Sequence, residues 1–492
     1  MSRVGRSPLT PARSLALAVT GPLLTAMVAI GSRLSWAAAA ATAAPLAAAA
    51  ALRRPHAALV AGWVCVIFIP IYWGLQLTPG IALVPATAVC LILLPAAAAA
   101  FKDVRVGALD VAVLLFFATQ AVAFLLNFES GASSTVALLS RGALGYGVVR
   151  CLSLLPSRRL ALASATVGCC VLFGVLAQLE ARGVDNPLFE MIRGVEAEVW
   201  ARPELRFGSV RAEVTFGHPI ALGLFLVQGV VLAVALSTVY PRRLPRYLIA
   251  VFLIGAGVLT TLSRTPFVAA AAALLLLALG LRRRQRWLLL PILAVPLAVL
   301  AFSPGAGTVG DLAGSLEGQS QAADSAEYRV RLLGVVTDPD NFSLFGRFTA
   351  VEGAGSVNSV ARQIGFPSFD NYFALVYLVT GAVPLLTLVI LCSIVWREAV
   401  APKLRAVDRG WACAAAGATL GLLSVGLLTQ YGDLLWFNIA LVASARQARL
   451  SGEADAVAPE SQLGVQRDRH SAPRRATPGV KTGASELRPG VV

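Results

Sequence analysis

The chain has 492 residues, of which 57% are hydrophobic and only 14% are charged, and its mean hydropathy is +0.75. This balance excludes a soluble globular domain. The net charge of +15 resides mainly in short links between apolar runs, and no basic stripe with interleaved aromatic residues accompanies it, which excludes a nucleic-acid partner. The sequence therefore predicts an all-α, polytopic integral membrane protein embedded in the lipid bilayer.

Apolar runs long enough to cross a bilayer as helices recur up to about residue 446. The first run follows a basic segment like that of a signal peptide, but a second apolar run comes at once, which favours an uncleaved first span. We expect about fourteen transmembrane helices, within a range of about 12 to 14. They lie near residues 14–32, 36–52, 57–75, 81–100, 107–126, 132–154, 160–179, 218–239, 246–262, 265–281, 287–303, 371–395, 409–429 and 431–446.

The basic residues test this count independently, because short cytoplasmic loops collect Lys and Arg. If the N-terminus is inside, the cytoplasmic links are those around Arg3, Arg53, Lys102, Arg158, Arg242, Arg282 and Arg397. The outward links are poor in basic residues or mixed in sign. We therefore expect a multi-pass protein of the cytoplasmic membrane of the cell, with both termini in the cytoplasm.

Two outward stretches are much longer than the usual helix connection of about 2 to 8 residues, and they are the expected working parts. The predicted organisation is N-terminal transmembrane helices over 1–179, an outer loop over 180–217, central transmembrane helices over 218–303, a long outer loop over 304–370, C-terminal transmembrane helices over 371–446 and a disordered cytoplasmic tail over 447–492.

Polar residues stand at the outward starts of three spans, where a plain membrane bundle has no need of them. The segments are RAEVTFGHPIALG, TLSRTPF and FDNYF, and their polar members are Arg211, Glu213, His218, Arg264, Asp370, Asn371 and Tyr372. Pro219 and Pro266 suit the first turn of the helices that follow.

The order and spacing of these segments resemble the O-antigen ligase and polymerase superfamily of bacterial membrane glycosyltransferases. The resemblance covers roughly residues 206–395 and includes the YRVRLLG and FGRF stretches of the long loop and the DNYFALVYLVTGAVPLL segment, in which the family's two glycines are reduced to Gly381. It implies a GT-C-like architecture with a long outer loop. It also implies transfer of a glycan from a polyprenyl-diphosphate carrier to an acceptor glycan hydroxyl on the outer face of the membrane, in exopolysaccharide, capsule or O-antigen-type synthesis.

The resemblance further implies a glycosyltransferase that works without a metal or another cofactor, and direct displacement at the anomeric carbon implies inversion. Its partners would be the lipid-linked donor, the acceptor glycan and other membrane proteins of polysaccharide assembly. Ligases of the family carry a histidine in the long loop where this chain has Asp370. This departure favours a polymerase or another capsular or exopolysaccharide transferase.

A diphosphate leaving group requires fixed positive charge, and the guanidinium of arginine pairs with phosphate oxygens while staying protonated. Arg211 and Arg264 are the first candidates for this role, and Arg329 and Arg331 fit a family pattern in the long loop. Arg264 could instead anchor the chain at lipid headgroups. Arg211 could instead be a solvated member of an ion pair.

Arg141 lies about ten residues into the sixth predicted span, where an ionisable group is a functional hypothesis by default. It either reaches the carrier diphosphate or pairs with Glu129. The acceptor hydroxyl requires a base, for which Asp370 is the first candidate, followed by Glu213 and His218. Asp370 also fits the cap of the next helix.

Other classes of function compete with the transferase. A flippase or transporter of lipid-linked oligosaccharides has a similar number of spans, and Arg141 is the feature that favours it. A non-enzymatic partner in a cell-wall complex is the third possibility. No metal site is expected, because the three histidines fall in different regions. The seven cysteines lie in or beside apolar spans and are expected to pack as small hydrophobic residues.

Overall fold

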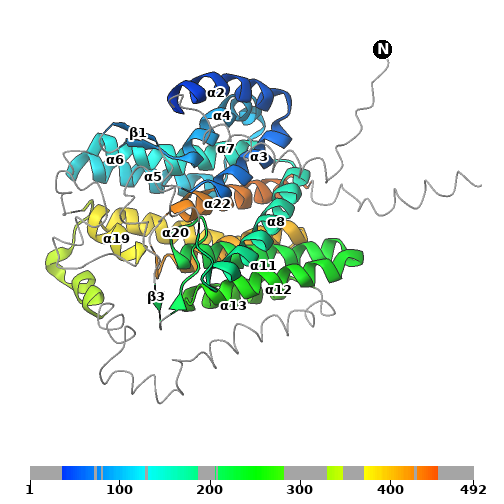
Figure 1. Ribbon diagram of the computed structural model, residues 1–492. Coiled ribbons are helices and arrows are strands. Elements are labelled where there is room, and N and C mark those ends of the chain that lie inside the picture. Colours follow the sequence, from blue (N-terminus) through cyan, green and yellow to red (C-terminus); the bar gives the residue numbers. More distant parts are fainter. Residues whose placement is uncertain are drawn as a thin grey trace, which may run out of the picture.

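The computed structural model describes residues 36–70, 75–78, 81–127, 131–186, 205–206, 209–281, 330–346, 371–425 and 429–452. Two predicted spans, near 14–32 and 287–303, fall outside these residues, as do most of both long loops and nearly all of the tail. The described chain is a bundle of helices that lie side by side, with two small β-hairpins (Figure 1).

Most of the described helices follow the predicted spans. They are α2 (Trp36–Arg53), α3 (Pro55–Phe68), α4 (Pro85–Ala100), α5 (Ala108–Asn127), α6 (Gly131–Leu138), the π-helical turn η3 (Leu139–Ala143), α7 (Leu144–Leu152), α8 (Pro156–Glu180), α11 (Pro219–Val239), α12 (Leu244–Thr260), α13 (Arg264–Gly280), α19 (Tyr372–Thr380), α20 (Ala382–Ala399), α21 (Ala406–Gly421) and α22 (Thr429–Leu450). Three 3-10 turns are η2 (Phe101–Asp103), η4 (Pro241–Arg243) and η5 (Pro339–Asn341).

The hairpins are antiparallel pairs of short strands. They pair β1 (Leu75–Thr78) with β2 (Ile81–Leu83) and β3 (Leu205–Arg206) with β4 (Ser209–Val210). The first hairpin corrects two predicted spans. For 57–75, α3 ends at Phe68 and β1 begins at the last residue of the span, and for 81–100, β2 occupies the first three residues.

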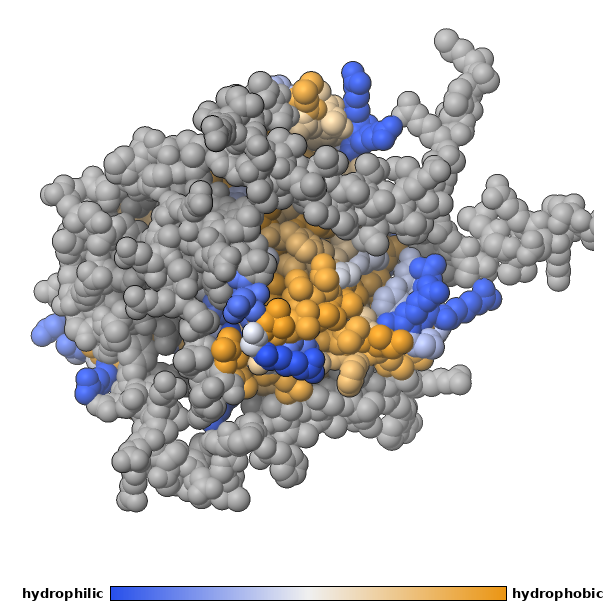
Figure 2. All heavy atoms as spheres, in the orientation of Figure 1, coloured by the Kyte–Doolittle hydropathy of each residue, from blue (hydrophilic) through white to orange (hydrophobic). Residues whose placement is uncertain are grey.

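Among the described residues, six helices are long and apolar enough to cross a membrane by length and composition. They span Pro85–Asp103, Ala108–Asn127, Pro156–Glu180, Pro219–Val239, Pro241–Thr260 and Ala382–Ala399. Figure 2 shows a continuous hydrophobic area over the middle of the face seen there, with hydrophilic side chains at its margins. Exposed apolar residues such as Phe252 on α12 belong to the surface that a membrane would solvate. The protein is therefore helical and membrane-embedded.

The span predicted as one helix over 371–395 is broken at Gly381, which has a φ of +95°. The segment before α19 causes the break, because residues 343–344 approach the backbone there. The carbonyl of Ser343 accepts a hydrogen bond from the Ala382 N–H at 2.8 Å, and the carbonyl of Leu344 accepts one from the Val383 N–H at 3.1 Å. A β-carbon at position 381 would clash with Leu344 and Gly346, so only glycine fits this junction.

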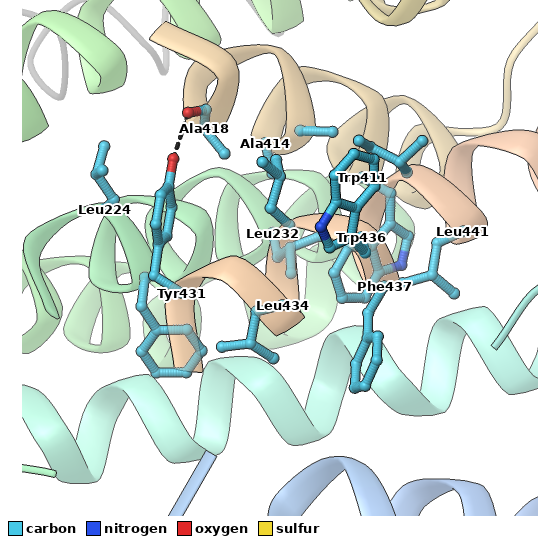
Figure 3. Packing of buried hydrophobic residues seen from close by; sticks show 14 of the residues in the cluster. Leu224, Leu232, Trp411, Ala414, Ala418, Tyr431, Leu434, Trp436, Phe437 and Leu441 are labelled. Atoms are coloured by element: carbon cyan, nitrogen blue, oxygen red, sulfur yellow. Dashed lines mark hydrogen bonds between the residues drawn. The ribbon is translucent and has the colours of Figure 1, made fainter. Parts of the chain in front are cut away.

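The core of the bundle is built around α11, which packs against α8, α12, α13, α21 and α22. Figure 3 shows part of it, where Leu224 and Leu232 of α11 meet aromatic side chains of α22 and small residues of α21. The hydroxyl of Tyr431 donates to the carbonyl of Ala418 there. Deeper in the core, the buried amides of Gln228 and Asn438 donate to each other at 2.9 and 3.1 Å, which fixes the register of α11 against α22.

Polar contacts join helix termini to one another at each end of the bundle, and we name the two ends after Arg159 and Glu213. At the Arg159 end, Arg159 pairs with Asp408, Arg150 with Asp110, and Arg446 with Glu398. At the Glu213 end lie residues 211–218 with the ends of α3, α8 and α12 and the starts of α11, α13 and α22. All seven cysteines are free thiols, and five of them are buried.

We expect Gly223→Ala to lower the free energy of unfolding by about 1–3 kcal/mol. The added methyl group would clash with the rigid ring of Pro266 and lie 3.2 Å from the Thr261 hydroxyl, so α11 and α13 would have to separate. Gly255→Ala is the matched control, because nothing lies within 4 Å of its β-carbon position on α12. Alanine favours a helix over glycine by about 1 kcal/mol, so this control should unfold no earlier than the unmodified protein. Equal losses in a denaturant titration of the two variants would contradict the packing argument.

Candidate functional site

Residues 211–218 form a stretch without helix that is nonetheless buried at one end of the bundle. Glu213 is 2% exposed and Thr215 is 4% exposed. Val214 and Gly217 have φ values of +49° and +59°, so the chain folds back on itself before α11 begins. Irregular backbone is tolerated in a membrane protein only where protein buries it or where it lines a cavity. We call residues 211–218 the buried loop.

The carboxylate of Glu180, the last residue of α8, anchors the buried loop. It accepts hydrogen bonds from the backbone N–H groups of Glu213 at 3.1 Å and of Val214 at 2.9 Å. The side chain of Asn186 donates to Glu180 at 3.3 Å and to the Val214 carbonyl at 2.9 Å. Glu180 is 7% exposed, so its charge is stabilised by oriented dipoles rather than by water.

Two further contacts fasten the buried loop to α3 and α22. The Thr215 hydroxyl donates to the carbonyl of Ile67 at 3.1 Å. The amide nitrogen of Gln430 donates to the carbonyls of Thr215 at 2.9 Å and of Ile69 at 3.3 Å. Because the nitrogen of Gln430 has these acceptors, the orientation of its amide is determined and its Oε1 is left as a buried acceptor.

Arg211 joins the buried loop to the corner that carries Arg264. Its Nε donates to the carbonyl of Thr261 at 3.1 Å, and its Nη2 donates to the Ser263 hydroxyl. The Ala212 N–H donates to the carbonyl of Thr260 at 3.2 Å. The sequence predicted that the two arginine segments lie at one level, and these bonds bring them into contact.

Arg264 is the exposed first residue of α13, with Ser263 before it as the N-cap residue. Leu262 has a φ of +47°, which turns the chain sharply between α12 and α13. The charge of Arg264 therefore stands beside the buried loop on a turn whose geometry is held by Arg211. Such a corner presents a guanidinium group at a defined place at the end of the bundle.

The remaining predicted residues of the buried loop are Glu213 and His218. Glu213 is buried, whereas His218 is partly exposed and occupies the N-cap position of α11, directly before Pro219. His218 makes no side-chain hydrogen bond to the first turn of that helix. Both residues belong to the buried loop, two and seven residues after Arg211.

Arg141 lies in the π-helical turn η3, and its Nε is 3.6 Å from Oδ1 of Asp433 on α22. The side chain of Asp433 is 3% exposed and that of Arg141 is 34% exposed. Glu129, one of the two partners expected for Arg141, falls outside the described residues. Asp433 belongs to none of the predicted motifs, although an acidic residue within an apolar span is itself a signal of function. The π-turn widens the helix where the pair forms, which is common at functional sites.

The Arg141–Asp433 pair is close to the buried loop along α22. Asp433 follows Gln430 by three residues on α22, a rise of about 4.5 Å, so the two side chains lie on the same face of the helix. Tyr372, at the start of α19, is 8% exposed and hydrogen-bonds the side chain of Gln120. Its N–H donates to the carbonyl of Leu422 at 2.8 Å. Arg141, Asp433 and Tyr372 thus extend the polar site into the bundle.

Several predicted residues have other surroundings. Asp370 and Arg329 fall outside the described residues. The side chain of Asn371 accepts the Ala374 N–H at 3.1 Å, so the cap of α19 that the sequence assigned to Asp370 is made by Asn371. Arg331 is exposed on a helix over residues 330–337, which packs on α19 through Leu332.

Within the described ranges, no group of three or more His, Cys, Asp or Glu side chains could hold a metal ion. Comparison with protein-family models, with curated proteins and with solved structures gave no match to this chain.

Proposed function

We propose that this protein is a glycosyltransferase of about fourteen transmembrane helices with a GT-C-like architecture, related to the O-antigen ligases and polymerases. It lies in the cytoplasmic membrane with both termini inside, so the Glu213 end faces outward. It moves an oligosaccharide from a polyprenyl diphosphate to the hydroxyl of an acceptor glycan, with inversion and without a metal. The order of the three outward motifs supports this assignment.

The observation that carries the proposal is the contact between the buried loop and the Arg264 corner. Arg211 donates to Thr261 and Ser263, the residues that lead into Arg264. A lipid-linked diphosphate has its charge at the level of the bilayer headgroups, where such a corner would meet it. Two guanidinium groups and the helix start at Arg264 favour the negative charge that develops on the leaving diphosphate.

The reaction then follows as a single displacement. The acceptor oxygen attacks the anomeric carbon and forms the new glycosidic bond, while the bond from that carbon to the phosphate oxygen breaks. The electron pair leaves with the polyprenyl diphosphate and is stabilised by Arg211 and Arg264. The hydroxyl proton passes to a base, for which Asp370, Glu213 and His218 are the candidates. Tyr372 and Asn371 would contact the sugar.

A flippase or transporter of lipid-linked oligosaccharides is the second candidate, and two observations favour it. The pair formed by Arg141 and Asp433 lies inside the bundle, and Gly381 interrupts a hydrophobic segment. Ionisable residues and broken helices at membrane depth mark substrate pathways in transporters. In the transferase, the same pair would position Arg141 toward the diphosphate from the membrane side.

We expect Arg264→Ala to slow glycan transfer by about 10²-fold, as removal of one charge-stabilising donor does in other enzymes. The assay uses the purified protein with a defined lipid-linked oligosaccharide and no added metal, and it measures joined repeats. Arg246→Ala is the matched control, because Arg246 is also an exposed arginine in the first turn of a helix, α12, but lies at the opposite end.

Cellular lipid analysis of the same variants separates the two functions. Unjoined units on the outer leaflet of cells with Arg264→Ala support the transferase, whereas units retained on the inner leaflet support the flippase. Unchanged glycan at a normal protein level would rule out both functions for this site.

A further inference from the structure

A cavity of about 110 Å³ lies at the Arg159 end of the bundle, opposite the buried loop. It opens between the segment that leads into α5 and the last turns of α22. Its polar lining consists of Arg105, Asp110, Arg150, Arg446, Gln447 and Ser451. Neither the motifs nor the proposed reaction assigns any role to this cavity.

Positive charge exceeds negative charge around this cavity. Arg150, whose side chain is 3% exposed, is balanced by Asp110 at 2.9 Å. Arg446 and Arg449 share the single carboxylate of Glu398, at 2.8 and 2.7 Å.

Arg105 is exposed, and its guanidinium takes part in no ion pair with the described residues. The cavity lining therefore holds three guanidinium groups, those of Arg105, Arg150 and Arg446, and one carboxylate, that of Asp110.

One donor at the cavity has no acceptor. The Nε of Arg446 is buried without a hydrogen-bond partner among the described residues, although Nη1 of the same side chain is bonded to Glu398. A buried N–H group without an acceptor is unfavourable, so the charge of Arg446 is incompletely compensated by the described residues. Gln447 cannot serve as that acceptor, because its Oε1 already accepts from Arg150 at 2.8 Å and from the Arg105 N–H at 3.0 Å.

An apolar surface begins next to this charged cavity. Gly107 lines the cavity, and the residues that follow it at helical spacing on α5 are Val111, 45% exposed, and Leu114, 61% exposed. Leu115 beside them is 52% exposed. A ligand that joins an anionic head to a long apolar tail would match both parts, whereas a free anion would use only the first.

We propose that this cavity binds the phosphate group of an anionic phospholipid of the cytoplasmic leaflet, with its acyl chains along Val111 and Leu114 of α5. The phosphate accepts from the exposed guanidinium of Arg105 and lies beside the guanidinium of Arg446, which also lines the cavity. Basic pockets between helices on the cytoplasmic side are suited to such headgroups. The binding site is independent of the transfer reaction at the other end of the bundle.

The test is native mass spectrometry of the detergent-purified protein with dioleoyl phosphatidylglycerol and dioleoyl phosphatidylcholine. The expected result is preferential retention of phosphatidylglycerol. Arg105→Gln should weaken that retention by about five-fold, the effect of one arginine near a membrane surface. Arg242→Gln is the control, because Arg242 is an exposed arginine in η4 at the same end but does not line the cavity.

Chain length and free phosphate distinguish a lipid site from an anion site. Dihexanoyl phosphatidylglycerol should bind more weakly than the dioleoyl lipid to the unmodified protein, a comparison that does not depend on the folding of any variant. Equal retention of the two dioleoyl lipids would overturn the proposal, as would equal losses in Arg105→Gln and Arg242→Gln. Displacement of the lipid by millimolar inorganic phosphate would assign the cavity to a free anion instead.

Discussion

Asp408→Ala is expected to lower the free energy of unfolding by about 3–5 kcal/mol, because it would leave a buried arginine without its counter-charge. Arg159 is fully buried, and its Nε and Nη2 donate to the two oxygens of Asp408 at 2.7 and 3.2 Å. Its Nη1 donates to the carbonyls of Ser153 and Leu154, so the guanidinium cannot turn toward water without breaking these bonds. A denaturant titration in detergent micelles measures the loss.

Two further variants identify the cause of that loss. Asp103→Ala removes an exposed carboxylate from η2 at the same end of the bundle and should change the stability by no more than about 0.5 kcal/mol. Asp408→Ala combined with Arg159→Met should recover part of the loss, because the buried charge is then gone. If the double variant were less stable than Asp408→Ala alone, the unpaired charge would not be the cause.

Glu180→Ala is expected to release the buried loop from the bundle. It leaves the N–H groups of Glu213 and Val214 buried without an acceptor, at about 1–3 kcal/mol each. Hydrogen exchange of residues 211–218 should therefore speed up, while exchange in the middle of α11 stays slow. If the proposed reaction is correct, glycan transfer also falls by at least about tenfold, because Arg211 and Glu213 are no longer held in place.

Glu180→Gln and Asp185→Ala are the comparisons for this experiment. The amide of glutamine retains one oxygen that can accept a backbone N–H, so exchange in the loop should be intermediate. Asp185 is an exposed acidic residue just beyond α8, and its removal should leave the loop unchanged. Unaltered exchange in Glu180→Ala would show that the loop is held without the carboxylate.

Hydropathy predicted most of the described helices because the thickness of the bilayer sets the length of an apolar span, and its backbone hydrogen bonds require a helix. The break at Gly381 was not predictable in this way. It depends on Ser343 and Leu344, which are about forty residues earlier and whose carbonyls take the N–H groups of the next helix. A local pattern reads such a segment as continuous, since one glycine is common in membrane helices.

The partners of the buried ion pairs were also not predictable from the neighbouring sequence. Basic residues near position 158 were interpreted as a cytoplasmic link that orients the chain, yet Arg159 is fully buried and pairs with Asp408, 249 residues away. Nearby Glu129 is one of the two partners that the sequence offers for Arg141, and the described structure places Asp433 from α22 beside Arg141. In each case the charge was visible in the sequence, but its partner depends on which helices become neighbours.

The candidate site was predictable to the extent that its residues belong to short motifs. Arg211, Glu213, His218 and Arg264 stand out because polar residues gather at the outward starts of three spans, on the side where basic residues are otherwise few. Glu180 belongs to none of these motifs and ends an apolar span. It anchors the loop by accepting from two backbone N–H groups more than thirty residues later in the chain. Because nearly every residue has such an N–H group, the sequence does not show which ones Glu180 contacts.

The burial of α11 has a consequence for how the chain is made. This helix is among the first to be completed in the second half of the bundle, yet α21 and α22, which cover one of its sides, are synthesised more than 160 residues later. Before α22 is synthesised, the side chain of Gln228 lacks its hydrogen-bond partner Asn438. Before α21 is synthesised, the side of α11 that packs on it is left open to lipid. Assembly of this protein in the membrane is therefore completed only by its last helices, and a chain that ends before residue 406 leaves one side of α11 uncovered, although α8, α12 and α13 already pack against its other sides.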